Sequence, residues 1–173
     1  ASAVVTSNSM KALYYLGRYD YELNASIVGE TDTRDEFGTD GRTGSRAIGC
    51  VVPHAGYMYS GHVAGAVYGA LDLPSLFIIL CPNHTGRGLP LAICSSGEWQ
   101  TPLGRAPVDG EAAALLKREC ALLGEDSEAH AGEHALEVQL PFLQRLKPGF
   151  TFVPIAVGVG DFRTLEELGR GLG

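Results

Sequence analysis

Two histidines of this 173-residue chain each follow an apolar run and a proline, a context suited to binding a ligand or moving a proton. The two stretches are Pro53-His54-Ala55-Gly56-Tyr57 and Pro82-Asn83-His84. Imidazole is the commonest protein ligand for a metal and the usual general acid or base near neutral pH. Because open α/β sheets bind ligands beyond the carboxyl ends of their strands, we expect both rings to face one crevice.

The predicted strands before His54 and His84 are separated by a single helix, and this connection favours neighbouring strands. A mononuclear site for Fe(II) or another divalent metal needs two histidines and one more ligand, often a carboxylate, with positions left open. We therefore predict that His54 and His84 bind a metal and that Tyr57 and Asn83 line the same pocket. The simpler alternative is that each ring is a loop histidine hydrogen-bonded to a backbone carbonyl.

A third stretch, Glu133-His134-Ala135-Leu136-Glu137, carries the remaining candidate site residues. His134 and Glu137 lie three positions apart and would share one face of a helix. Such a pair binds a metal or supports acid–base chemistry, because a carboxylate orients an imidazole and stabilises its charged form. We predict that His134 and Glu137 are catalytic and that Glu133 lines the pocket. The alternative is a hydrogen-bonded pair that anchors the helix to the sheet.

Apolar runs predict the strands that position these residues. Buried strands are expected at 47–52 and 76–81, a further strand at 150–157, and a strand nearer an edge at 91–95. Helical spacing predicts helices over 60–71, 110–122, 133–146 and 164–172. Strands that alternate with helices predict an α/β fold, in which a mostly parallel or mixed sheet is flanked by helices on both faces as a three-layer sandwich.

Capping residues and prolines refine three of these helices. Ser60 is expected to cap the first helix, which would bury Val63 and Val67 on one face. Asp109 is expected to cap the second. Pro141 either kinks the third helix or opens its second part.

Residues 1–46 differ in composition from the rest of the chain, because 31–46 is polar and rich in glycine. We interpret 1–46 as a variable N-terminal segment, partly loop or disordered, and 47–173 as one α/β domain. The chain ends in or just after a predicted helix, where an α/β unit normally continues into a strand. We therefore expect the domain to be truncated at its C-terminus.

Composition argues against several classes of function. A formal net charge of -7 disfavours nucleic-acid binding, which needs a basic stripe. No apolar run approaches the roughly 20 residues of a membrane span, and no signal-peptide pattern opens the chain. Cys50, Cys81, Cys94 and Cys120 lie in apolar surroundings without C-x-x-C spacing, so we interpret them as reduced, buried residues of a cytoplasmic protein. We expect no nucleotide cofactor.

Four stretches in register resemble the Memo-like protein family, whose bacterial and archaeal members are known as AmmeMemoRadiSam system protein B. The resemblance covers roughly 47–160, and its motifs are Val52-Pro53-His54-Ala55-Gly56-Tyr57, Cys81-Pro82-Asn83-His84, Trp99-Gln100-Thr101-Pro102-Leu103-Gly104 and Glu133-His134-Ala135-Leu136-Glu137. By itself the tryptophan turn is a pocket wall or, more simply, a cover for the core.

The family is similar to class III extradiol dioxygenases, which use non-haem iron to open catechol rings. The resemblance implies that His54 and His84 are metal-site histidines and that His134 and Glu137 belong to a pocket-facing helix. The implied function is a metal-dependent oxidoreductase of dioxygenase type, holding Fe(II) or another divalent metal. The alternative is a non-catalytic module on the same fold that binds a small molecule, a peptide or an anion.

The family association also implies two protein partners, a radical-SAM protein and an AMMECR-type protein. Family members normally continue into a further strand that ends in an aspartate and a histidine. Nothing after Val157 matches this ending. We therefore expect the third metal ligand to be absent from this chain.

Overall fold

The computed structural model describes residues 4–5 and 47–173 of the chain. The expectations for the rest of 1–46, including the polar loop at 31–46, lie outside the described residues. None of the described helices has the length and apolar character of a membrane span. The elements in chain order are β1 (Val4–Val5), α2 (Tyr57–Gly69), β2 (Leu76–Pro82), β3 (Leu91–Ile93), β4 (Glu98–Thr101), β5 (Gly104–Pro107), α3 (Gly110–Glu119), β6 (Gly124–Glu125), the 3-10 helix η1 (Glu137–Gln139), α4 (Leu140–Leu146), β7 (Thr151–Val157) and α5 (Phe162–Leu172).

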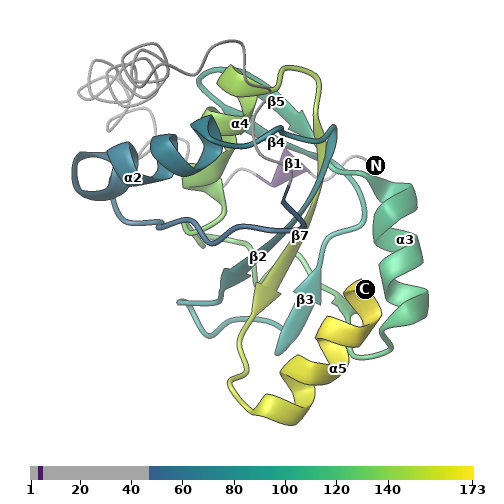
Figure 1. Ribbon diagram of the computed structural model, residues 1–173. Helices are drawn as coiled ribbons and strands as arrows, with labels where there is room; N and C mark the ends of the chain where they lie inside the picture. The colour runs from purple at the N-terminus through teal and green to yellow at the C-terminus, as the bar shows by residue number, and fades with distance from the viewer. Residues whose placement is uncertain (1–3, 6–46) are drawn as a thin grey trace.

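The main sheet has four strands in the order β2-β7-β3-β6 and is mixed. Strand β7 pairs in parallel with β2 and antiparallel with β3, and β3 pairs in parallel with the short β6. Helices α2 and α4 lie on one side of this sheet, and α3 and α5 lie on the other (Figure 1). The predicted α/β fold with helices on both faces of a mixed sheet is therefore confirmed.

Strand β7 lies between two hydrophobic cores, and its side chains pack alternately into one core and the other. Phe152 and Ala156 pack in the core shared with α2 and α4, whereas Val153 and Ile155 pack in the core shared with α3 and α5. All four side chains are fully buried. Successive side chains of a strand point to opposite faces, so a strand covered on both faces must be apolar throughout. This is why the run at 150–157 was recognisable from the sequence.

A smaller sheet, in the order β1-β4-β5, carries the tryptophan turn. Strands β4 and β5 form an antiparallel hairpin with its turn at Pro102 and Leu103, and β5 begins at Gly104, whose φ of 120° favours glycine. Trp99 is only 3 % exposed, and its ring meets Phe152 edge to face with the centroids 5.7 Å apart. Trp99 therefore covers the core, which is the simpler of its two interpretations.

The predicted cap of the second helix is confirmed in α3. The Asp109 carboxylate accepts a hydrogen bond from the Ala112 N–H at 3.0 Å and closes the first turn. Its second oxygen accepts from the Thr151 hydroxyl at 2.9 Å, which ties the start of α3 to β7. The helix ends at Glu119, earlier than predicted, because Cys120 has an extended backbone.

Helix α2 differs from the prediction in its start and in its buried face. It begins at Tyr57, and Ser60 lies inside the helix rather than capping it. Val63, expected on the buried face, is 44 % exposed. The face that packs consists mostly of small residues: Ser60, Gly61, Ala64, Gly65, Tyr68 and Gly69. Small side chains let this helix approach its neighbour α4 closely, so fit decides the buried face rather than hydrophobicity.

The predicted buried strand at 47–52 is wrong in this structure. These residues form no strand, and Ile48 and Val51 are fully exposed. Cys50 is exposed as well, so the expectation of four buried cysteines holds only for the other three. An apolar run becomes a strand only where a neighbouring strand satisfies its backbone hydrogen bonds. Among the described residues, β2 keeps its outer edge unpaired.

Two other strands differ from the prediction in burial. Strand β2 exists as predicted, but Leu76, Ile78 and Leu80 are about two-fifths exposed on its uncovered face. Strand β3, expected near an edge, is fully buried between β7 and β6. The two-residue strand β6, which was not predicted, takes the edge position.

The predicted helix at 133–146 is wrong in its first part, but Pro141 opens its second part, which is one of the two roles predicted for this proline. Glu133 and His134 lie in irregular backbone, the 3-10 helix η1 begins at Glu137, and α4 begins only at Leu140. Pro141 stands in the first turn of α4, where the missing N–H of proline costs no hydrogen bond. His134 and Glu137 therefore do not share a helix face.

Candidate metal centre

The loop after β2 presents His84, and Asn83 shapes this loop. The Asn83 Oδ1 accepts hydrogen bonds from the Gly86 N–H at 3.0 Å and from the Thr85 hydroxyl at 2.9 Å. Its Nδ2 donates to the Arg87 carbonyl at 2.6 Å. An asparagine that closes a turn in this way fixes the direction of the chain after a strand. The side chain of His84 is left 45 % exposed, so solvent and ligands reach its ring.

Glu133 joins two of the histidines. Its fully buried carboxylate accepts from the His84 N–H at 2.6 Å, from His84 Nδ1 at 2.9 Å and from the Ala135 N–H at 2.9 Å. His134 Nδ1 lies 3.4 Å from the same oxygen that Ala135 contacts. Burial by itself raises the pKa of this carboxyl, but the hydrogen bonds from His84 and Ala135 outweigh burial and hold the pKa below its usual range. Glu133 is therefore a carboxylate at neutral pH.

His54, from the segment before α2, completes a cluster of three imidazoles. Its ring centroid lies 5.2 Å from that of His84 and 6.0 Å from that of His134. The rings of His84 and His134 are 5.0 Å apart and nearly parallel, at 21°. The expected meeting of His54 and His84 is thus observed. Burial, followed by the neighbouring rings, lowers the pKa of His54 and favours the neutral form that binds metals.

The donor atoms in this cluster fit a metal ion. The ligand atoms of His84, Glu133 and His134 all lie within 4.8 Å of one another. Ligand atoms at bonds of about 2.1 Å to one metal are roughly 3–4 Å apart, so small side-chain rotations suffice to bring these atoms together. Imidazole nitrogens with a carboxylate suit iron, zinc and other first-row divalent ions, and the donor set does not select among them.

Three other predicted site residues lie beside the cluster. The amide of Asn83 is used within its own loop. The ring of Tyr57 packs edge to face on Phe142, with the centroids 5.8 Å apart. Burial, and after it the charge of Glu137, raises the pKa of Tyr57. The predicted roles of Tyr57 and Asn83 in lining the pocket, and of Glu137 in catalysis, stay predictions.

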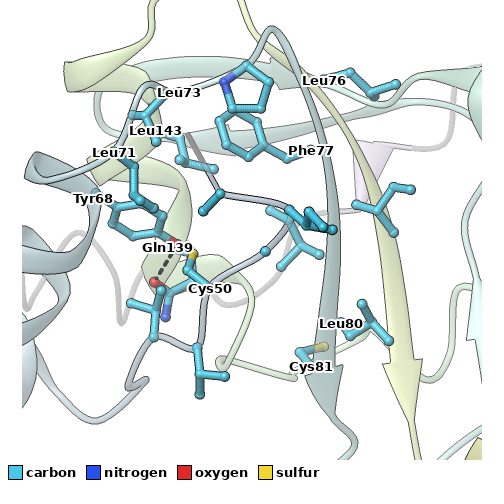
Figure 2. Close-up of a pocket in the computed structure, with 18 of the residues that line it drawn as sticks. Cys50, Tyr68, Leu71, Leu73, Leu76, Phe77, Leu80, Cys81, Gln139 and Leu143 are labelled. Carbon is cyan, nitrogen blue, oxygen red and sulfur yellow. Dashed lines mark hydrogen bonds between the residues drawn. The ribbon is translucent and has the colours of Figure 1, made fainter. Parts of the chain in front are cut away.

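A cavity of about 710 Å³ opens beside the cluster and is lined mainly by apolar side chains. His54 and Ala135 line it, so the cavity reaches the imidazole cluster. Figure 2 shows β2 along one side of the cavity, with the end of α2 and the loop after it opposite. The apolar residues labelled on these walls are Leu71, Leu73, Leu76, Phe77 and Leu80. A mainly apolar cavity with a few polar groups at one end is the usual form of a small-molecule site.

Gln139 is a buried polar residue that the sequence analysis did not single out. Its Nε2 donates to the Pro53 carbonyl at 3.0 Å, and its Oε1 accepts from the Tyr68 hydroxyl at 3.0 Å. The dashed line in Figure 2 marks the second of these bonds. The signal in the sequence is an amide between the apolar residues Val138 and Leu140. Such a pattern does not reveal partners far away in the chain.

Comparisons with known proteins agree with the resemblance. The model of the Memo-like protein family matches residues 21–173. The chain is 44 % identical over 128 residues to a MEMO1 family protein of Methanopyrus kandleri, which covers 72 % of this chain and 45 % of that protein. It is 46 % identical over 132 residues to a MEMO1 family protein of Pyrobaculum arsenaticum, with 75 % and 47 % covered.

A third relative, a MEMO1 family protein of Aeropyrum pernix, is 48 % identical over 121 residues, with 68 % of this chain and 43 % of the relative covered. The chain therefore spans about half the length of the curated relatives that it matches. The aligned part holds most of the described residues, so the similarity concerns the same body that carries the imidazole cluster.

Proposed function

This chain belongs to the Memo-like protein family, and on that premise we propose that it binds a divalent metal ion at His54 and His84, with the ring of His134 beside them. The observation that carries the proposal is the buried carboxylate of Glu133 beside two of these rings, those of His84 and His134. We further propose that the site serves a metal-dependent oxidoreductase of dioxygenase type. The second step depends on the likeness of the family to extradiol dioxygenases.

The hydrogen bonds of Glu133 support a division of labour among the ring nitrogens. A carboxylate only accepts, so the His84 Nδ1 that contacts it must carry the proton. In the neutral ring this tautomer leaves the Nε2 of His84 free to bind a metal. Histidine ligands usually donate their other ring N–H to a carboxylate in this way, which fixes the tautomer and raises the basicity of the ligand nitrogen. Glu133 therefore fits an orienting role better than that of a direct ligand.

The remaining residues supply positioning and proton transfer. When bound, a divalent metal supplies a Lewis acid at positions left open by the protein and, if it is iron, a centre that changes oxidation state. His134, whose side chain is 56 % exposed, is able to exchange a proton with solvent. The apolar cavity beside His54 would hold the apolar part of a substrate and keep water away from it.

Metal binding by purified protein tests the first step of the proposal. Calorimetric titration with Fe(II) without oxygen, and with Zn(II), should show one site in the wild-type chain. His84→Ala removes a ligand and should abolish or severely weaken binding. Glu133→Gln should weaken it about 10- to 100-fold, as is typical when the partner of a ligand is replaced.

His62→Ala is the matched control, because His62 is an exposed histidine of α2 and belongs to no ligand group among the described residues. It should leave the metal affinity unchanged. Absence of metal binding by the wild-type chain, or equal affinity in all the variants, would contradict the proposal.

A second function, ligand binding without chemistry, is supported by the cavity itself. A mainly apolar wall that reaches three imidazoles also suits a peptide or small molecule with an anionic end. Oxygen uptake by the Fe(II)-loaded protein with a panel of catechols distinguishes the two functions. Uptake supports the oxidoreductase, whereas ligand affinity without any turnover supports the binding module. The radical-SAM and AMMECR-type partners and the cytoplasmic location stay predictions.

A further inference from the structure

His54 differs from the other two imidazoles in how it is held. His84 and His134 both meet Glu133 through Nδ1, at 2.9 Å and 3.4 Å. The His54 ring lies beside the rings of His84 and His134. It forms no hydrogen bond with a side chain or backbone group of the described residues. Its position is therefore set by the backbone that carries it.

The backbone that carries His54 has few anchors. Residues 47–53 form no strand, and Ile48 and Val51 extend into solvent. On the other side of His54, the Ser60 hydroxyl donates a long hydrogen bond of 3.4 Å to the Ala55 carbonyl. Among the described residues, the backbone of 47–53 is held by a hydrogen bond that Gln139 Nε2 donates to the Pro53 carbonyl. This carbonyl belongs to the peptide bond that leads into His54.

Gln139 is itself held in place. Gln139 is 5 % exposed and Tyr68 is 6 % exposed. The Tyr68 hydroxyl donates a hydrogen bond to the Gln139 Oε1. The amide needs both partners here, because a buried polar atom without a partner is destabilising. The bond from Tyr68 fixes which end of the amide faces Pro53. Along the chain, Gln139 lies 71 positions from Tyr68 and 86 positions from Pro53.

We propose that Gln139, oriented by Tyr68, is a positioning residue that sets His54 against His84 and His134. This inference rests on the proposed metal site for its consequence, but the placement of His54 is measurable without metal. Gln139→Met keeps the length of the side chain and removes both hydrogen bonds. The variant should weaken metal affinity about tenfold, within the range found when groups that orient ligands are replaced.

Gln144→Met is a matched control on the neighbouring helix α4. Gln144 also uses both ends of its amide, accepting from the Thr101 hydroxyl at 2.6 Å and donating to the Gly104 carbonyl at 3.1 Å. These partners lie in the hairpin of β4 and β5, away from Pro53. This variant should lose thermal stability but keep the metal affinity of the wild-type chain.

A double-mutant test shows whether Gln139 acts through His54. In a His54→Ala background, Gln139→Met should have almost no further effect on metal affinity. A tenfold loss in that background as well, or no loss in either background, would overturn the proposal. Tyr68→Phe, which leaves the Pro53 bond but frees the amide to rotate, should act in the same direction with a smaller loss. It serves as the second variant if Gln139→Met does not fold.

Nuclear Overhauser contacts among histidine ring protons, measured without metal on histidine-labelled protein, provide the independent readout. Contacts between His54 and the other two rings should be present in the wild-type chain and in Gln144→Met, and absent in Gln139→Met. Their persistence in Gln139→Met would overturn the inference. If the wild-type chain binds no metal, the proposed function fails, while these contacts still decide the role of Gln139.

Discussion

At the scale of single residues, Glu133 shows how one buried charge organises several neighbours. A buried carboxylate is costly unless donors surround it, and Glu133 has donors from the backbone and the ring of His84 and from the backbone of Ala135. The same bonds that make the charge tolerable also orient the ring of His84, and the Nδ1 of His134 lies 3.4 Å from the same carboxylate. Stability and site geometry are therefore coupled at this residue.

Glu133→Gln tests this coupling through pH. The folded-state pKa of Glu133 lies below its usual value of about 4.5, so its carboxylate stabilises the fold above that pH and loses this contribution as pH falls through the lowered pKa. At pH 7 the variant should be less stable by about 1.5–3 kcal/mol, the range for hydrogen bonds to charged groups. Urea unfolding at pH 7 and at pH 4 should show the gap between the two proteins narrowing in acid. A constant gap would contradict the assignment.

His130 makes a second pH prediction, with the same sign as that of Glu133 but at a higher pH. It is fully buried against Trp99, and neither ring nitrogen has a well-formed hydrogen bond with a described residue. Burial lowers its pKa, although the Ala92 backbone and the carboxylates of Asp126, Glu133 and Glu125 oppose this shift. A lowered histidine pKa means that the unfolded chain takes up its proton first, so stability falls as pH drops below about 6.5.

His130→Leu removes the titrating group and should flatten that decline. The measurement is the free energy of unfolding in urea between pH 7 and pH 5, where wild type should lose more stability than the variant. Parallel curves for the two proteins would show that His130 is not the group responsible.

Sequence reasoning at this scale identified the residues that follow strands and missed those that contact distant backbone. His84 was predictable because ligand sites form where strands end, and it follows β2. His54 was found from the same pattern, although 47–52 forms no strand in the structure. Glu133 was assigned only to the pocket wall, since a carboxylate that accepts from His84, 49 positions away, looks like any other acidic residue in the sequence. Gln139 was not predicted as a site residue, because its hydrogen-bond partner Pro53 is 86 positions away in the chain.

At the scale of elements, two apolar runs of similar composition behave differently. The run at 150–157 becomes β7, because β2 and β3 flank it and helices cover both of its faces. The run at 47–52 remains irregular beside the open edge of β2. Composition records that a segment is fit for burial, whereas its neighbours decide whether it pairs. The same limit applies to 133–146. The apolar spacing there predicts a helix from Glu133, but the residues before Glu137 are not helical and α4 begins only at Leu140.

Cys50 reports on the segment at 47–52. In the structure Cys50 is exposed while Cys81, Cys94 and Cys120 are buried, so one thiol should react with an aromatic disulfide reagent well before the others. Partial burial raises the pKa of Cys50, so the assay is best run at alkaline pH, where more thiolate is present.

Cys50→Ser identifies the reacting thiol, because it should remove the fast phase and leave the slow one. Four slow thiols in the wild-type chain would show that 47–52 is buried in solution, as the sequence alone suggested. The assay thus distinguishes the two conformations of this segment.

At the scale of the whole molecule, the sheet divides the described body into a well-covered half and an open half. Strands β7 and β3 have helices over them, whereas β2 exposes Leu76, Ile78 and Leu80. The chain also spans about half the length of its curated relatives. Stability should therefore be concentrated on one side of the sheet.

A pair of isoleucine-to-alanine variants measures this asymmetry. Ile155 in β7 is fully buried, so Ile155→Ala removes packed methyl groups and leaves a cavity, at a cost of about 2–5 kcal/mol. Ile78 in β2 is 38 % exposed, so Ile78→Ala should cost less than about 1 kcal/mol. Urea unfolding of both variants at several protein concentrations provides the comparison. Equal losses that grow with concentration would mean that another copy of the chain covers β2 in solution, which would overturn the assignment of β2 as the open side.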